Sequence, residues 1–322
     1  MEEKILVIGS NGQVGSELIK VLRQQYGTKN VLGADVHFPG DNMDAGPFIR
    51  MDILNKVLLE DVIKEKKITQ IYALAAMLSA TAERNPEMAW QLNMQGLLNV
   101  LELARIYNLQ VFWPSSIAVF GPDSPKVLCP QQAVMEPRTV YGISKVAGEL
   151  WCQYYFEKFS VDVRSIRYPG LISYETVPGG GTTDYAIAIF HEALQNGKYT
   201  CFLSEGTRLP MMYMPDAIRA TVKIMQAPAE HIKVRTSYNI AAMSFSPGEL
   251  AGEIRRHIRG FKIACLPDYR QQIAESWPQS IKDTAARKDW GWQHDYDLEK
   301  MTADMLQNIR RQLESALVAE KN

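Results

Sequence analysis

Short apolar runs alternate with helix-like patterns along the first half of the chain. The runs expected to form buried strands lie at 5–8, 31–34, 48–51, 71–74, 111–113 and 163–168. Between them, apolar residues recur at helical spacing, which predicts helices near 14–22, 54–66 and 86–107 and another across residue 141. This alternation favours an α/β fold, a doubly wound parallel sheet with helices on both faces. Ligands of such sheets bind at the carboxyl ends of the strands.

The alternation stops after Tyr168. The segment Pro178–Gly181 reads Pro-Gly-Gly-Gly, which the interior of a helix or strand would not tolerate. Further helices are expected at 184–196, 215–226, 247–257 and 297–317, with a short strand near 199–203. We therefore predict a sheet domain over residues 1–170, to which 205–241 returns. A smaller, interleaved α+β lobe would comprise mainly 171–204 and 242–322, with the C-terminal helices.

Composition narrows the classes of function. The 322 residues include 35 basic and 36 acidic side chains, a formal charge of -1, so no overall field favours nucleic acid or an anionic membrane. The four cysteines form no Cys-x-x-Cys pair and the five histidines show no metal-ligand spacing, which predicts reduced thiols and no metal site. No signal peptide or membrane-length apolar run is visible, so we expect a cytoplasmic location; a cleaved organellar presequence would leave no trace.

Three glycines follow the first expected strand, in Gly9-Ser-Asn-Gly12-Gln-Val-Gly15. In a strand–turn–helix unit the first permits a tight turn, the second lets the backbone approach a pyrophosphate, and the third lets helix and strand pack closely. The N-terminus of the helix would offer N–H groups to the phosphates. The segment predicts that 1–170 is a Rossmann-type dinucleotide-binding domain, and a glycine-rich turn without a ligand is the alternative.

Two aspartates stand at the ends of the next expected strands. Asp35 ends the second strand, where a carboxylate can bind a ribose diol and would repel a 2′-phosphate. No arginine lies within the following ten residues, so NAD is favoured over NADP. Asp52 follows the third strand and could contact the adenine or cap the next helix.

The segment Thr139–Gly148 places Tyr141 and Lys145 four residues apart, on one face of the expected helix. A phenol titrates near pH 10, so a tyrosine that acts as a base near neutrality needs a cation close by. Ser115 and Ser116 end the fifth strand beside this helix, and either hydroxyl could face a substrate. The same spacing recurs at Tyr154 and Lys158, but three to four turns further from the strand ends, which favours a structural or surface role there.

These features together resemble the extended short-chain dehydrogenase/reductase superfamily: the glycine turn, Asp35, Ser116–Gly121 and Tyr141-x-x-x-Lys145. Phe120 is a modest departure, since many members have tyrosine there. Segments of the second half resemble the short-chain-type L-threonine 3-dehydrogenases of that superfamily, and they extend the resemblance over nearly the whole chain: Arg167–Ile172, Pro178–Tyr185, Leu209–Met214, Arg235–Asn239, Ala274–Pro278 and Ala286–Trp292.

The resemblance implies NAD-dependent oxidation of the C3 hydroxyl of L-threonine to 2-amino-3-oxobutanoate, in threonine catabolism towards glycine or aminoacetone. It assigns a triad to Ser116, Tyr141 and Lys145. The phenolate would take the hydroxyl proton, the serine would hold the developing carbonyl oxygen, and the lysine would lower the tyrosine pKa and hold the cofactor. Together with the glycine turn, the resemblance predicts these cofactor contacts: Gly9, Asn11, Gly12, Gln13, Val14, Asp35, Asp52, Ile53, Leu74, Ala75, Ala76, Asn93, Tyr141, Lys145 and Tyr168.

The expected substrate contacts come from several segments: Ser79, Ser116, Tyr141, Gly181, Thr182, Thr183 and Trp277. N–H groups and hydroxyls of 181–183 could hold a carboxylate, or this loop could pack on itself. Ser79 could reach the substrate or cap a helix, and Trp277 could form a pocket wall or part of the core. Arg167 could serve the site or a structural ion pair.

The expected partners are the small-molecule substrate and a second copy of the chain. Outward apolar residues such as Trp151, Tyr154 and Tyr155 mark the helix near 86–107 and the helix that carries Tyr141, and the resemblance implies that two such helices pair across a two-fold axis in a homodimer. Two rival functions share the scaffold. An NDP-sugar epimerase or dehydratase would need a basic pocket for a second diphosphate, and an NAD-binding regulator without catalysis would not need Tyr141 with its lysine.

Overall fold

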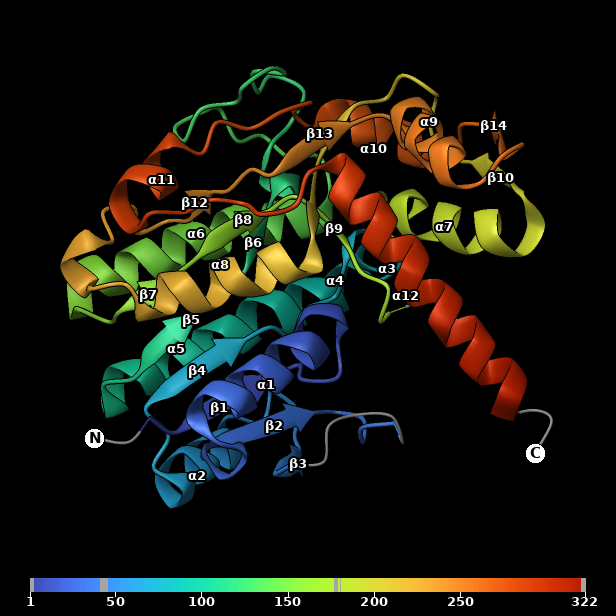
Figure 1. Cartoon of the computed structure of the whole chain (residues 1–322). Coiled ribbons are helices and arrows are strands. Elements are labelled where there is room, and N and C mark those ends of the chain that lie inside the picture. The colour runs from blue at the N-terminus through green and yellow to red at the C-terminus, as the bar shows by residue number, and fades with distance from the viewer. Residues whose placement is uncertain (1–2, 41–45, 177–178, 180, 320–322) are drawn as a thin grey trace.

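The computed structural model describes residues 3–40, 46–176, 179 and 181–319. Its centre is a parallel six-stranded sheet with strand order β3-β2-β1-β4-β5-β7 (Figure 1). The strands are β1 Ile5–Ile8, β2 Val31–Asp35, β3 Phe48–Arg50, β4 Gln70–Ala73, β5 Gln110–Phe112 and β7 Val163–Arg164. The order reverses between β1 and β4, so the predicted doubly wound Rossmann-type fold is confirmed.

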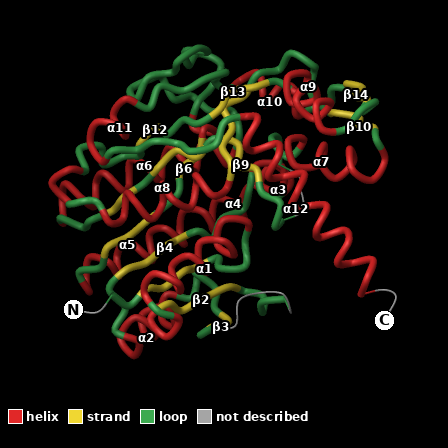
Figure 2. The backbone as a smooth tube through the Cα atoms, viewed as in Figure 1, coloured by secondary structure: helices red, strands yellow, loops and turns green. Residues whose placement is uncertain are grey.

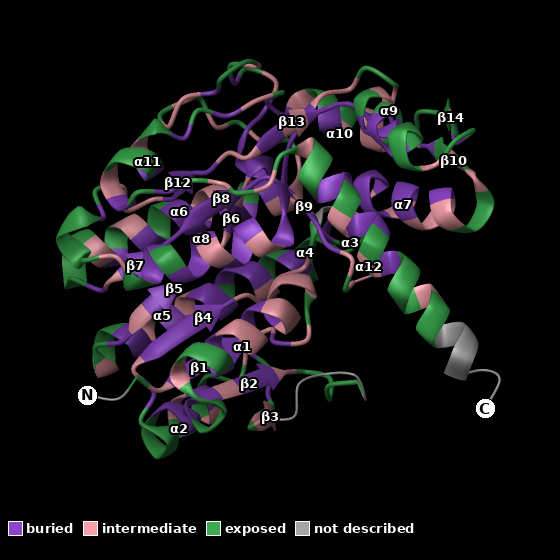
Figure 3. Ribbon diagram, viewed as in Figure 1, coloured by how far each residue is buried: buried purple, intermediate pink, exposed green. Residues whose placement is uncertain are grey.

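Helices cover both faces of this sheet, because every second side chain of each strand points to the opposite face. Leu6 and Ile8 of β1 pack in a core with α2 Lys56–Lys66, α5 Gly96–Tyr107 and α6 Val140–Phe159. Ile5 and Val7 belong to the opposite core, formed by three other helices: α1 Gln13–Tyr26, α8 Met214–Gln226 and α11 Thr284–Trp290. Figure 3 shows both helix layers buried on their sheet-facing sides.

The long helix expected over 86–107 is observed, with an interruption. It consists of α4 Pro86–Trp90, a π-helical turn over Gln91–Gln95, and α5. π-turns occur frequently at functional sites. Asn93 lies in this turn and is buried, and its amide bonds both the N–H and the C=O of Met77.

The single strand expected over 163–168 is divided at Ser165. Its first part is β7, and its second part, β8 Ile166–Tyr168, lies in a parallel three-stranded sheet between β6 Ser115–Ser116 and β12 Tyr238–Asn239. The register places Ser115 beside Arg167 and Ser116 beside Tyr168. Residues from three distant parts of the chain are thus brought to one edge.

The remaining elements pack around a further core and lie mainly at the upper right of Figures 1 and 2, with α12 (Leu298–Ala319) running down the right side; we call them the smaller lobe. Its strands are β9 Gly170–Ile172, β11 Leu209–Tyr213 and β13 Met243–Phe245 in one sheet, and β10 Lys198–Cys201 with β14 Lys262–Cys265 in another. Its helices are α7 Tyr185–Asn196, α9 Pro247–His257, α10 Arg270–Ser276 and α12 Leu298–Ala319, while α3 Ser79–Arg84 lies near α6. None of the helices in the described residues combines the length and apolarity needed to cross a bilayer.

Candidate active site

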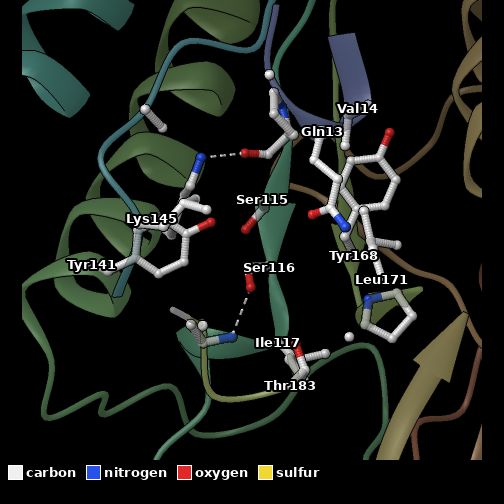
Figure 4. Close-up of a pocket in the computed structure, with 18 of the residues that line it drawn as sticks. Gln13, Val14, Ser115, Ser116, Ile117, Tyr141, Lys145, Tyr168, Leu171 and Thr183 are labelled. Atoms are coloured by element: carbon white, nitrogen blue, oxygen red, sulfur yellow. Dashed lines mark hydrogen bonds between the residues drawn. The ribbon is translucent and has the colours of Figure 1, made fainter. Parts of the chain in front are cut away.

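A cavity of about 1120 Å³, counting its open mouth, lies at the carboxyl edge of the sheet (Figure 4). Its walls come from the glycine turn, from β6 and the residues after it, from α6, and from Tyr168–Leu171. The smaller lobe closes it with 181–184 and Trp277. In Figure 4, Tyr141 and Lys145 stand on one side of strand β6, and Gln13 and Val14 stand on the other.

The glycine turn has the geometry of a phosphate cradle. Gly9 has φ +84°, a conformation that favours glycine, and a Cβ at Gly15 would overlap the Gly9 carbonyl oxygen. Helix α1 starts after Gly12 without a side chain that caps its first N–H groups. Because these donors point along the helix axis toward the turn, the residues present fit a pyrophosphate at this position.

A second cavity adjoins the first and shares Gly9 and Gly12 with it, and Asp35, Asp52, Ile53 and Ala75 line it. The Asp35 carboxylate accepts from the N–H groups of Asn11 at 3.1 Å and His37 at 3.2 Å, which fixes it at the strand end. The two cavities together suit a dinucleotide: the ribose diol would lie at Asp35 and the adenine beyond it.

Two features at this second cavity were not foreseen. Asp52 accepts from the N–H of Leu54 at 2.9 Å, but Asn55 is the side chain that caps α2. Arg50 lies beside Asp35 in the register of β2 and β3, although its guanidinium donates to the Val36 carbonyl at 2.9 Å. The ten residues that follow Asp35 contain no arginine, whereas Arg50 comes to lie beside it from the neighbouring strand β3.

The two serines at the end of β5 have different partners. Ser115 also lines the cavity, but its hydroxyl donates to the buried Glu149 carboxylate at 2.6 Å, so its proton is already engaged. Ser116 accepts from the N–H of Ala118 at 3.2 Å and lines the cavity together with Tyr141, whose pKa its hydroxyl lowers. Of the two, Ser116 therefore has the geometry to assist Tyr141.

Burial dominates the electrostatics of the tyrosine and lysine. It raises the pKa of Tyr141 to about 12, against the opposing hydrogen bond from Ser116. Burial also lowers the pKa of Lys145 to about 7, against the charge of Glu149. Lys145 donates to the Pro114 carbonyl at 2.6 Å, and its Nζ lies 5.5 Å from the centre of the Tyr141 ring.

The second tyrosine–lysine pair lies on the same helix, α6, as expected. Tyr154 is 47% exposed and packs edge-to-face on Trp151 at 5.6 Å, and neither Tyr154 nor Lys158 lines the cavity. Distance along the helix therefore separates two pairs that look alike in sequence.

The loop from the smaller lobe differs in detail from its expected role. The N–H of Gly181 donates to Asp184 at 2.7 Å, so it is not the free carboxylate donor that the sequence suggested. Thr182 is 2% exposed, and among the described residues its hydroxyl has no hydrogen-bond partner. Thr183 and Trp277 line the cavity, and Trp277 is also part of the small-lobe core. Ser79 begins α3, and its side chain lies outside the described residues.

Comparisons with known proteins agree with this geometry. The family model described as NAD dependent epimerase/dehydratase family matches residues 5–241. The chain belongs to this family. It is 56% identical to a GalE-like L-threonine dehydrogenase from Cupriavidus necator in its holo form, with a TM-score of 0.93 over 95% of this chain and 99% of that one.

Two further L-threonine 3-dehydrogenases are similar to this chain over nearly its whole length. The mitochondrial L-threonine 3-dehydrogenase of Bos taurus is 45% identical over 307 residues, 95% of this chain and 82% of the bovine protein. A monomeric L-threonine 3-dehydrogenase from a metagenome, in its apo form, is 48% identical, with a TM-score of 0.92 over 95% of this chain and 99% of that one.

The structure adds residues to this epimerase/dehydratase site that the sequence did not indicate. The cavity is also lined by Leu78, Pro114, Ile117, Ala118, Pro169, Gly170, Leu171 and Asp184. Six of these residues lie in segments that carried the family resemblance, Ser116–Gly121, Arg167–Ile172 and Pro178–Tyr185, but no role was assigned to them there. Leu78 and Pro114 lie outside these segments. Asn93 was expected to contact the cofactor, but its amide holds the segment after β4 through Met77 and also bonds Ser144 at 3.2 Å.

Among residues 3–40, 46–176, 179 and 181–319, no group of three or more His, Cys, Asp or Glu side chains could hold a metal ion.

Proposed function

We propose that this chain oxidises the C3 hydroxyl of L-threonine to 2-amino-3-oxobutanoate with NAD+. The observation that carries the proposal is the meeting of Ser116, Tyr141 and Lys145 in one cavity with the glycine turn. The threonine dehydrogenase relatives are 45–56% identical over nearly the whole chain, which favours this substrate over an NDP-sugar. The product would place the reaction in threonine catabolism.

Each residue of the triad has a task that its position supports. The Tyr141 oxygen would take the proton of the C3 hydroxyl, since it reaches the cavity from the start of α6. The Ser116 hydroxyl would hold the same substrate oxygen as its carbonyl forms. Lys145, as an ammonium, would stabilise the Tyr141 phenolate and bind the ribose of the cofactor. Bound NAD+ supplies the hydride acceptor.

Substrate recognition is assigned to the smaller lobe. The buried Thr182 hydroxyl, unpartnered among the described residues, can donate to the threonine carboxylate, and Thr183 lies beside it in the cavity wall. The Trp277 ring would exclude water from the methyl side of the substrate. A buried hydroxyl without a partner costs free energy, and a bound carboxylate would remove that cost.

Formation of NADH from NAD+ and L-threonine, followed by absorbance, tests the function. D-Threonine and L-allo-threonine serve as stereochemical controls, and NADP+ tests the preference that Asp35 implies. Conversion of an NDP-sugar without net NADH would replace the proposal with the epimerase function. Tight NAD+ binding without turnover of any small alcohol would indicate a regulator.

We expect Lys126 to keep Trp277, which forms part of the cavity wall, in position. Its ammonium donates to the carbonyls of Glu275 and Ser276, both at 2.9 Å, at the end of α10. A Lys126→Met variant should raise the KM for threonine by roughly five- to tenfold, since loss of about 1 kcal/mol of charge-assisted bonding loosens the wall. NAD+ affinity should not change. An unchanged KM would show that the wall needs no such support.

We also propose that two copies pair through the outer face of α5 and α6. This face carries the exposed side chains Ile106, Leu150, Trp151, Tyr154 and Phe159, an apolar group that a lone surface rarely presents. One relative is described as monomeric, so the point needs a direct test.

Light scattering should give the mass of a dimer for the wild-type chain, and a Leu150→Glu/Trp151→Glu double variant should give the mass of a monomer. Val57→Glu, at a 71% exposed position on α2, should leave the dimer intact. A monomeric wild-type protein at micromolar concentration would refute the pairing.

A further inference from the structure

A row of polar side chains crosses the sheet beneath the proposed catalytic centre. The parallel registers put Ser115 of β6 beside Arg167 of β8, and Arg167 beside Asn239 of β12. All three are buried. Arg167 donates to Asn239 Oδ1 at 2.9 Å and to the Gln131 carbonyl at 3.0 Å. The row therefore joins three strands that lie far apart in sequence.

Glu149 of α6 completes this row. Its carboxylate is 0% exposed and accepts from Arg167 Nε at 2.8 Å and Nη2 at 2.7 Å. The same Oε1 that binds Nε also accepts from the Ser115 hydroxyl at 2.6 Å. Burial of an ion pair is costly unless its geometry is good and its remaining hydrogen bonds are satisfied, and a bidentate pair with a third donor meets that condition.

The position of Glu149 on α6 connects the row to the reacting groups. Tyr141, Lys145 and Glu149 are four residues apart, so they lie on one face of the helix, one turn after another. Ser116, the neighbour of Ser115, lines the same cavity as Tyr141. Glu149 is thus connected to the two elements that carry these side chains: it lies on α6 with Tyr141, and it binds β6 through Ser115.

We propose that Glu149 is a positioning residue of the active site, which holds Ser116 against Tyr141 through Ser115 and provides the counter-charge to Lys145. The assignment rests on the proposed function for its effect on catalysis. Its effect on Lys145 is independent of substrate.

Among the described groups around Lys145, Glu149 is the one that can provide its counter-charge. On α6 the groups that face it are Tyr141, Glu149 and Cys152, and Cys152 has a pKa raised well above its usual value by burial, so it is a neutral thiol. From the β5–β6 connection come the Pro114 carbonyl and the Trp113 ring, whose centre is 4.3 Å from Nζ. Beyond Glu149 lies the Arg167 guanidinium, which the carboxylate already pairs. Among the described residues that face Lys145, Glu149 is the anion.

A Glu149→Gln variant separates positioning from plain stability. It keeps the size of the side chain and an oxygen for Ser115 but removes the charge. We expect kcat for threonine to fall about tenfold while NAD+ affinity stays within about twofold, the pattern of lost transition-state alignment. Because Lys145 would lose its counter-charge, its pKa should fall, and the alkaline limb of the kcat–pH profile should move to lower pH.

Ser115→Ala tests the positional part alone, since it removes one hydrogen bond and no charge. It should lower kcat about threefold without moving the pH profile. Glu253→Gln is the matched control: Glu253 is a 9% exposed carboxylate of α9, paired with Arg256 at 3.0 Å, and its loss should change neither kcat nor the profile.

A substrate-free readout distinguishes failure of this inference from failure of the proposed function. NMR titration of protein labelled at lysine Cε, with the Lys145 signal assigned by a Lys145→Arg variant, should show a lower Lys145 pKa in Glu149→Gln than in the wild type. An unchanged Lys145 pKa overturns the counter-charge role, and wild-type kcat in both Glu149→Gln and Ser115→Ala overturns the positional role. A wild-type chain that forms no NADH with threonine overturns the proposed function and leaves the titration to test Glu149.

Discussion

A Tyr141→Phe variant should bind NAD+ as the wild type does and lose threonine oxidation by about 10²–10⁴-fold, the usual contribution of a positioned proton acceptor. The substitution removes one oxygen from a side chain that is packed at the start of α6, so the cavity should keep its shape. Turnover is measured by NADH formation and NAD+ affinity by quenching of tryptophan fluorescence.

The chain provides its own control in Tyr154. This tyrosine also precedes a lysine by four residues on α6, but it is 47% exposed and far from the cavity. Tyr154→Phe should therefore retain wild-type turnover. Near-normal activity of Tyr141→Phe, or an equal loss in both variants, would remove Tyr141 from its assigned role.

Tyr141 and Tyr154 also show what could be predicted from the sequence alone. The strands around Gly9, Asp35 and Ser116 were predictable because their signals are local: an apolar run, then a glycine or a polar residue at its end. The position of Tyr141 in the cavity wall and of Tyr154 outside it was predictable too, since it needed only the rise along one helix and the end of the preceding strand.

Residue type and spacing left the choice between Ser115 and Ser116 open, although the family resemblance assigned the triad to Ser116. The choice depends on Glu149, 34 residues away, and on Arg167, which reaches both through the pairing of β6 with β8. The same holds for Gly181, whose N–H is taken by Asp184. Hydrogen-bond competition of this kind is a property of the folded chain, so residue type and spacing do not reveal it.

The smaller lobe was only partly predictable for a related reason. Helix α9 matched its expected bounds, because it opens with a capping box at Ser246 and Glu249. By contrast, β9, β11 and β13 are short, and they exist by pairing with one another across long stretches of chain. Short strands of this type have no periodicity long enough to distinguish them from loops.

A Gly15→Ala variant should lose most of its NAD+ affinity and unfold at a lower temperature. Two effects of opposite sign compete at this position. Alanine in a helix is favoured over glycine by about 1 kcal/mol. However, the added Cβ would overlap the Gly9 carbonyl oxygen and lie 2.8 Å from Ser10 Cα, both backbone atoms of the turn itself. Relief of that overlap must move the turn, and overpacking of this kind costs about 1–3 kcal/mol or more.

Gly252→Ala isolates the favourable effect, because Gly252 lies inside α9 and a Cβ there meets nothing within 4 Å. It should raise the unfolding free energy by about 0.5–1 kcal/mol and leave NAD+ binding unchanged. The two variants carry the same chemical change in two helices, so opposite shifts in thermal unfolding would trace the difference to the contact between α1 and the turn. If Gly15→Ala bound NAD+ with wild-type affinity, the turn could not be the phosphate cradle, since a displaced Gly9–Gly12 backbone would no longer present its N–H groups to the pyrophosphate.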